Sequence, residues 1–85
     1  MARYTIVLHP EPEEGGYSVT VPALRGCTTQ GDTFEEAVAN AHEAIAGWLD
    51  TLADLGEPIP VEDARLAVAG VEVDLPAMGK EGQAA

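Results

Sequence analysis

The sequence predicts an α+β fold, a two-layer sandwich in which one long helix covers a small sheet in the order β-β-β-α-β. Three observations predict it. Short segments that alternate apolar and polar residues, as strands do, fill roughly the first third of the chain. One amphipathic segment over residues 34–55 has the period of a helix. A further strand-like segment, residues 65–73, follows that helix, and Gly70 marks a bulge or a break in it.

The first two strands are predicted over residues 3–9 and 17–21, where apolar residues occupy every second position. Residues 10–16 separate them and are rich in Pro and Gly, which favours a hairpin loop. A short third strand is expected over residues 27–30, closed by Gly31. These three strands are close enough in the chain to pair as an antiparallel meander.

The helix is predicted to begin at a capping box. Thr33 is followed three residues later by Glu36, so the Thr33 hydroxyl is expected to accept from the Glu36 amide while the Glu36 side chain reaches back to the Thr33 amide. Gly56 and the prolines after it end the helix. The apolar residues, spaced three and four apart, form one continuous seam: Val38, Ala41, Ile45, Trp48, Leu49, Leu52 and Leu55.

The predicted topology follows from these elements. A right-handed crossover through the helix would place the fourth strand parallel to the first, giving the sheet order 3-2-1-4 with the third and fourth strands as edges. At 85 residues the chain has room for one core. We therefore expect a single domain over residues 1–76 and a flexible tail over residues 77–85.

The composition is strongly acidic, with 15 Asp and Glu against 4 Lys and Arg and a net charge of −11. Repulsion from phosphates disfavours direct nucleic-acid binding and favours a basic protein partner. No apolar run is long enough for a membrane span or a signal peptide, and the single cysteine builds neither a disulfide framework nor a thiolate zinc site. We expect a cytoplasmic protein without a cofactor.

Catalysis is not predicted. His9 and His42 are expected at solvent-exposed edges, and Cys27 as a buried packing residue. The strand and helix order also matches the front half of a ribonuclease H core, whose two-metal chemistry needs a carboxylate on the first strand. Residues 3–9 contain no Asp or Glu, so a nuclease is the least favoured reading.

The distribution of charge along the predicted helix indicates a candidate binding surface. Acidic residues fall on one stripe opposite the apolar seam, and no Lys or Arg occurs within residues 34–55. Such a stripe can serve solubility alone or bind a basic partner. The partner-binding candidates are Glu36, Glu43, Asp50 and Asp54. For contacts between copies of the chain, the candidates are the third-strand edge and the end of the helix, namely Thr28, Thr29, Gln30, Trp48, Leu52 and Leu55.

The chain also resembles a known family. The residues that carry the resemblance are Gly15-Gly16-Tyr17-Ser18-Val19-Thr20-Val21-Pro22, Leu24, Gly26-Cys27, Thr29, Gly31-Asp32-Thr33, Glu35-Glu36-Ala37, Asn40-Ala41, Glu43-Ala44-Ile45 and Trp48-Leu49. This pattern resembles the HicB family of antitoxins. The resemblance implies a partial ribonuclease H-like fold without catalysis. It also implies a type II toxin–antitoxin role, in which the protein masks a small basic HicA-like toxin that cleaves messenger RNA.

The chain departs from the family pattern in two places. Many members carry a C-terminal DNA-binding module, whereas the residues after Pro60 are predicted here as a strand and a tail, so promoter binding is not expected. The position between Val-Pro and Leu, often acidic in the family, is Ala23. A protein-interaction or small-ligand module of the same fold, working without a toxin, is the alternative function. A homo-oligomer is expected in either case.

Overall fold

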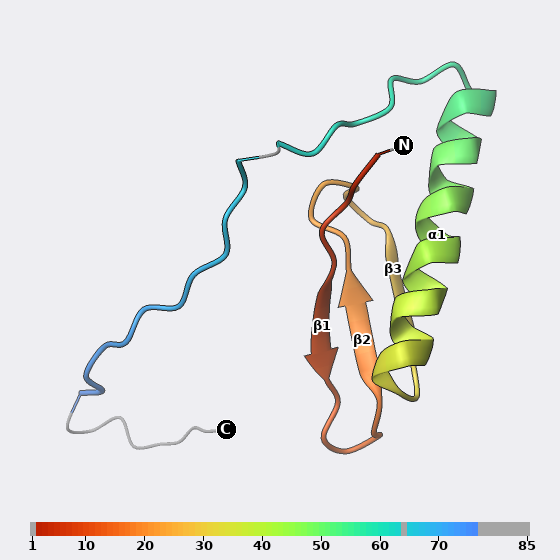
Figure 1. Ribbon diagram of the computed structural model, residues 1–85. Coiled ribbons are helices and arrows are strands. Elements are labelled where there is room, and N and C mark those ends of the chain that lie inside the picture. The colour runs from red at the N-terminus through yellow and green to blue at the C-terminus, as the bar shows by residue number, and fades with distance from the viewer. Residues whose placement is uncertain (1, 64, 77–85) are drawn as a thin grey trace.

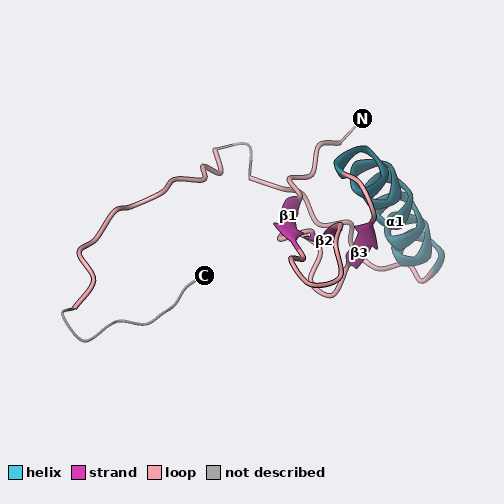
Figure 2. Cartoon of the chain, turned by 90° about the horizontal axis from the view of Figure 1, so that it is seen from below, coloured by secondary structure: helices cyan, strands magenta, loops and turns pink. Residues whose placement is uncertain are grey.

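The computed structural model describes residues 2–63 and 65–76 and contains a three-stranded antiparallel sheet and one long helix (Figure 1). The strands are β1 (Val7–Pro10), β2 (Tyr17–Thr20) and β3 (Thr28–Gly31), in the order β1-β2-β3. The helix α1 (Phe34–Asp54) packs on β3 and β2, forming a second layer (Figure 2). The α+β class and the antiparallel meander are confirmed.

The hairpin between β1 and β2 forms where the Pro and Gly run predicted it. The Glu11 amide donates to the Gly16 carbonyl at 2.9 Å, and the Gly15 amide donates to the Glu11 carbonyl at 2.7 Å. Both glycines have positive φ, 80° and 77°, a conformation that other residues rarely adopt. Pairing then brings Leu8 opposite Val19, and Val19 opposite Thr29.

The helix begins and ends on local signals. The Thr33 hydroxyl accepts from the Glu36 amide at 3.0 Å, as predicted. The Glu36 carboxylate, however, accepts from the Asp32 amide at 2.6 Å. The predicted bond from the Thr33 amide was therefore wrong by one residue. At the other end Gly56 has φ 71°, and the Glu57 amide donates to the Leu52 carbonyl at 2.9 Å in a Schellman-type cap.

The core consists of two small clusters between the layers. Their buried members are Val19, Ala37 and Ala41 in one cluster, and Val21, Leu24 and Cys27 in the other. The predicted helix seam is rotated, because Ala37 is buried while Val38 and Leu55 are exposed. Gly31 explains the rotation: a side chain there would collide with the helix backbone at Ala37, so its absence lets α1 lie against β3.

The predicted fourth strand does not form. Residues 65–73 belong to no strand, and from residue 65 to residue 76 the chain runs extended and away from the sheet (Figure 1). Before this, the linker crosses beside the N-terminal segment, where the Tyr4 hydroxyl donates to the Pro60 carbonyl and the Glu62 carboxylate accepts from Thr5. The predicted tail over residues 77–85 lies outside the described residues. Within the described ranges, no helix combines the length and apolarity that crossing a membrane requires.

Candidate functional site

The acidic helix face comprises Glu36, Glu43, Asp50 and Asp54, and all four side chains are exposed. Helical spacing places them along one side of α1, away from the buried residues Ala37 and Ala41. In residues 2–63 and 65–76 the one ion pair is Arg65 with Asp63, at 3.1 Å, and it lies in the segment after the helix. The carboxylates of the acidic helix face therefore have no cationic neighbour within the described chain.

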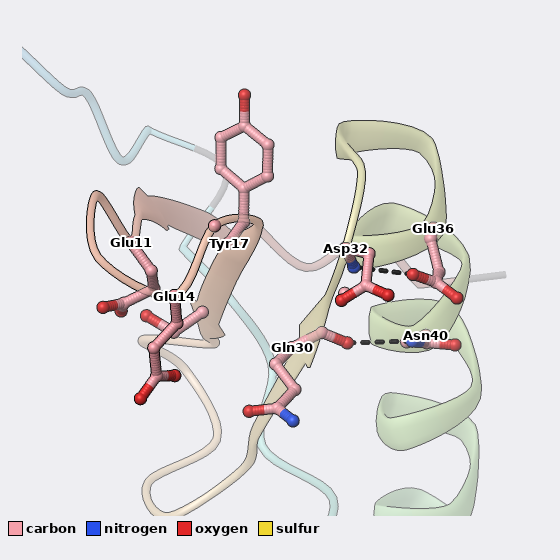
Figure 3. Close-up of a pocket in the computed structure, with 10 residues that line it drawn as sticks. Glu11, Glu14, Tyr17, Gln30, Asp32, Glu36 and Asn40 are labelled. Carbon is pink, nitrogen blue, oxygen red and sulfur yellow. Dashed lines mark hydrogen bonds between the residues drawn. The ribbon is translucent and has the colours of Figure 1, made fainter.

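A polar hollow of about 430 Å³ adjoins the first turn of the helix (Figure 3). The hairpin loop contributes Glu11 and Glu14 to its wall, and the β3–α1 junction contributes Asp32 and Glu36. We call these four residues and the space between them the acidic hollow. No Lys or Arg lines it. Glu36 belongs both to the hollow and to the acidic helix face, so the two acidic surfaces are continuous.

Hydrogen bonds hold the helix side of the hollow in place. The Asp32 amide donates to the Glu36 carboxylate, and the Asn40 side-chain amide donates to the Gln30 carbonyl at 2.8 Å (Figure 3). Both bonds link the end of β3 to the first two turns of α1. The orientation of Glu36 is therefore set by the β3–α1 junction as well as by the helix.

Sequence reasoning missed Glu11, Glu14 and Asp32 as members of this surface. Glu11 and Glu14 lie in a Pro- and Gly-rich loop, where acidic residues are usually interpreted as solvent-exposed charges without a specific role. Their position beside the helix start depends on the β1–β2 hairpin turning next to the end of β3. The close approach of Gly16 to Gly31 makes that possible, because any side chain on Gly16 would collide with the Gly31 carbonyl oxygen.

The residues examined for catalysis lie where the sequence predicted. His9 and His42 are both exposed, and Cys27 is buried in the core. Burial raises the pKa of the Cys27 thiol, which disfavours the reactive thiolate. Of the described residues, no three or more His, Cys, Asp or Glu side chains come close enough together to hold a metal ion.

The candidates for contacts between copies are dispersed. Thr28 and Gln30 are exposed, but the β3 edge that carries them lies beside α1. The Gln30 carbonyl already accepts a hydrogen bond from the Asn40 side chain. Trp48 is half-buried and packs on the cluster of Val21, Leu24 and Cys27. Thr29 and Leu52 are half-buried, and Leu55 is exposed at the helix end. A role for these six residues in an interface stays a prediction.

Comparisons with known proteins identify a family of similar sequences. Residues 4–75 match the family model of the HicB-like antitoxin of bacterial toxin–antitoxin systems. The chain is 47% identical over 60 residues to a UPF0150 protein of Synechocystis sp., covering 71% of this chain and 75% of that protein. It is 44% identical over 62 residues to a UPF0150 protein of Thermoplasma acidophilum, covering 73% of this chain and 88% of that protein.

A named antitoxin is also similar. Antitoxin HicB 1 of Photorhabdus laumondii is 41% identical over 59 residues, which is 69% of this chain and 37% of that antitoxin. The shared part therefore corresponds to a little over a third of the longer protein. Since the family model spans most of the chain, from the segment before β1 to the residues after α1, the chain belongs to the HicB-like antitoxin family of bacterial toxin–antitoxin systems.

Proposed function

We propose that this chain neutralises a small basic HicA-like RNase toxin by covering the toxin's RNA-binding surface with the acidic helix face and the acidic hollow. The toxin would be the chain's protein partner in a type II pair, acting in the cytoplasm where messenger RNA is translated. Neutralisation would be occlusion without catalysis, on a partial ribonuclease H-like fold whose first strand carries no carboxylate. Direct binding to nucleic acid is not part of the proposal, because the chain's net charge is −11.

One observation carries the proposal: a continuous acidic surface without a basic residue on a member of an antitoxin family. Glu36 joins the hollow to the helix, so exposed carboxylates follow the molecule from the hairpin loop to Asp54 near the helix C-terminus. The negative end of the helix dipole makes Asp50 and Asp54 locally unfavourable. A basic partner offsets both this cost and the mutual repulsion of the carboxylates.

The chemistry of the partner explains why such a surface suits it. A protein that grips RNA presents Lys and Arg side chains spaced to meet phosphates. A row of carboxylates can bind the same Lys and Arg side chains, and long-range attraction accelerates the encounter of the two proteins. Bound in this way, the antitoxin would exclude RNA from the toxin.

The proposal is tested by charge reversal on the helix. Glu43→Lys with Asp50→Lys is expected to lower the association rate constant with a purified HicA-like toxin about tenfold at low salt, because electrostatic steering is lost. The difference should shrink at high salt as the charges are screened. Stopped-flow fluorescence or biolayer interferometry at two salt concentrations measures both effects.

A matched control distinguishes an effect of the acidic helix face from an effect of the protein's net charge. Glu72→Lys with Asp74→Lys makes the same charge change in the extended segment after the helix, where both residues are exposed. The association rate should change far less in this control. Equal losses in the two double variants, or an unchanged rate in the helix variant, would remove the acidic helix face from the mechanism. Failure of the unmodified chain to bind such a toxin or relieve its RNA cleavage would favour a module that works without one.

A further inference from the structure

Residues 65–76, which we call the C-terminal arm, present large apolar side chains to solvent. Leu66 is 51% exposed, Val68 83% and Val71 85%. Val73 and Leu75 are 76% and 77% exposed and alternate with Glu72 and Asp74, so they share a face with Val71. Leu66 and Val68, before Gly70, are out of step with them by one position. Soluble chains rarely leave such a series without a partner surface. The arm has one Arg against Glu72 and Asp74 and so a net charge of −1, which opposes self-association less than the net negative charge of the rest of the molecule does.

The body of the molecule has an apolar groove that nothing in the described chain fills. Its volume is about 380 Å³. One wall comes from the segment before β1, with Tyr4 and Ile6, and the other from the helix flank, with Val38, Ile45 and Leu49. The groove exists because α1 packs on β3 and β2, which leaves the part of the sheet next to β1 uncovered.

The edge of β1 beside this groove has no neighbouring strand in the described chain, since β1 pairs only with β2. Just before β1, the Thr5 amide donates to the Glu62 carboxylate instead of to a backbone carbonyl. In the hairpin the Glu11 amide donates to the Gly16 carbonyl, so it points toward β2. Because successive amides of a strand point in opposite directions, those of Val7 and His9 also point toward β2, and the Leu8 amide faces the open side. The edge can therefore accept another strand.

The arm of the same chain is directed away from this edge. At the start of the arm, the Asp63 carboxylate accepts from the Arg65 amide at 2.9 Å and from its guanidinium at 3.1 Å. The Leu66 amide donates to the Asp63 carbonyl at 3.0 Å, which closes a turn. Beyond this turn the arm extends away from the sheet in both views (Figures 1 and 2).

We propose that the C-terminal arm of one copy pairs with the β1 edge of a second copy, parallel to β1, and places its apolar side chains in that copy's groove. The exchange is reciprocal in a two-fold dimer, so each sheet gains its fourth strand from the partner. Val71, Val73 and Leu75 of each arm share one face of the strand and become covered in the partner's groove. The groove lies on the helix flank away from the acidic helix face, so the dimer leaves both acidic faces open.

Full-length variants test the pairing. Light scattering coupled to size-exclusion chromatography should find the unmodified chain as a dimer, and Val71→Asp with Val73→Asp as a monomer with the same far-ultraviolet circular dichroism. The matched control, Glu72→Gln with Asp74→Asn, changes the alternate positions of the arm and should remain dimeric. A monomeric unmodified chain, or a dimer that survives the two aspartates, would overturn the proposal.

Cross-linking distinguishes exchange from an arm that folds back on its own sheet. In a Cys27→Ala background, one chain carries His9→Cys and a mass-tagged second chain carries Val71→Cys. A short bis-maleimide should join the two chains in the mixture. When both cysteines are on one chain, exchange should give cross-links between two copies, and an excess of cysteine-free chain should reduce them because most partners then lack cysteine. Persistent intrachain cross-linking would show that the arm completes its own sheet. Loss of toxin binding by an arm variant, with the unmodified chain monomeric, would assign the arm to the toxin instead.

Discussion

Two segments of this chain carry the same alternation of apolar and polar residues but have opposite surroundings. Residues 17–21, Tyr-Ser-Val-Thr-Val, include the central strand, and within them Val19 is 0% exposed. Residues 71–75, Val-Glu-Val-Asp-Leu, project into solvent, and each of their large apolar side chains is more than three quarters exposed. The first segment has β1 and β3 on either side and α1 above it; the second has no neighbour within the described chain. An alternating pattern therefore indicates a strand, while burial depends on a partner.

The largest expected difference between the two regions is in the core. Leu24 is 1% exposed, so Leu24→Ala should lower the free energy of unfolding by about 2–5 kcal/mol through lost burial and a cavity. Val73→Ala in the arm should leave the unfolding of dilute monomer nearly unchanged. Urea denaturation followed by Trp48 fluorescence measures both variants. Similar losses would mean that the arm packs on its own body.

Two glycines, one in the body and one in the arm, should show the same contrast with a smaller change in the free energy of unfolding. A methyl group on Gly31 would meet the helix backbone at Ala37, whereas one on Gly70 in the arm would have open space around it. Gly31→Ala should therefore cost about 1–3 kcal/mol from overpacking. Gly70→Ala should leave the body's stability unchanged. Thermal unfolding of the two variants tests this, and a stable Gly31→Ala protein would contradict the close packing of α1 on β3.

The hydrogen bonds at the start of the helix and at the start of the arm should also contribute unequally to stability. Thr33→Ala removes the acceptor for the Glu36 amide at the helix start and should cost about 1 kcal/mol. Asp63→Ala removes the acceptor at the start of the arm and should change body stability by less than about 0.5 kcal/mol, because that turn is exposed. Denaturant midpoints compare the two. An equal shift for Asp63→Ala would indicate that the turn supports the body.

The smallest expected effect lies at Glu62, where the linker meets the body. The Thr5 amide, then the Thr5 hydroxyl, and at longer range Arg3 hold the pKa of the Glu62 carboxyl below its usual value. Its contribution to stability is therefore present above about pH 4.3, the value of an unfolded Glu, and is lost as the pH falls through the lower folded value. An NMR titration of the Thr5 amide should report this loss. Glu62→Gln should abolish the titration and the control Glu57→Gln should retain it; a Thr5 amide that titrates normally in Glu62→Gln would contradict the contact.

Much of the fold could be predicted because its signals are local. The capping box at Thr33, the terminating Gly56 and the spacing of apolar residues give the helix almost to the residue, and Gly15 and Gly16 give the hairpin. The rotation of the helix seam could not be read in this way, because it depends on the contact of Gly31 with Ala37. Of the acidic surface, the helical stripe follows from periodicity alone, whereas Glu11, Glu14 and Asp32 join it only through the fold.

The sequence by itself determined the order of the first three strands and the helix, the bounds of the helix, the family and the row of unpaired charge along the helix. These depend on neighbours within a few residues, where backbone propensity, capping and helical period act directly. The tertiary structure alone decided that the hairpin loop extends the acidic surface to the helix start and that the arm leaves its own sheet. Both depend on contacts between residues far apart in the chain, and on whether a strand edge has a partner, which alternation does not encode.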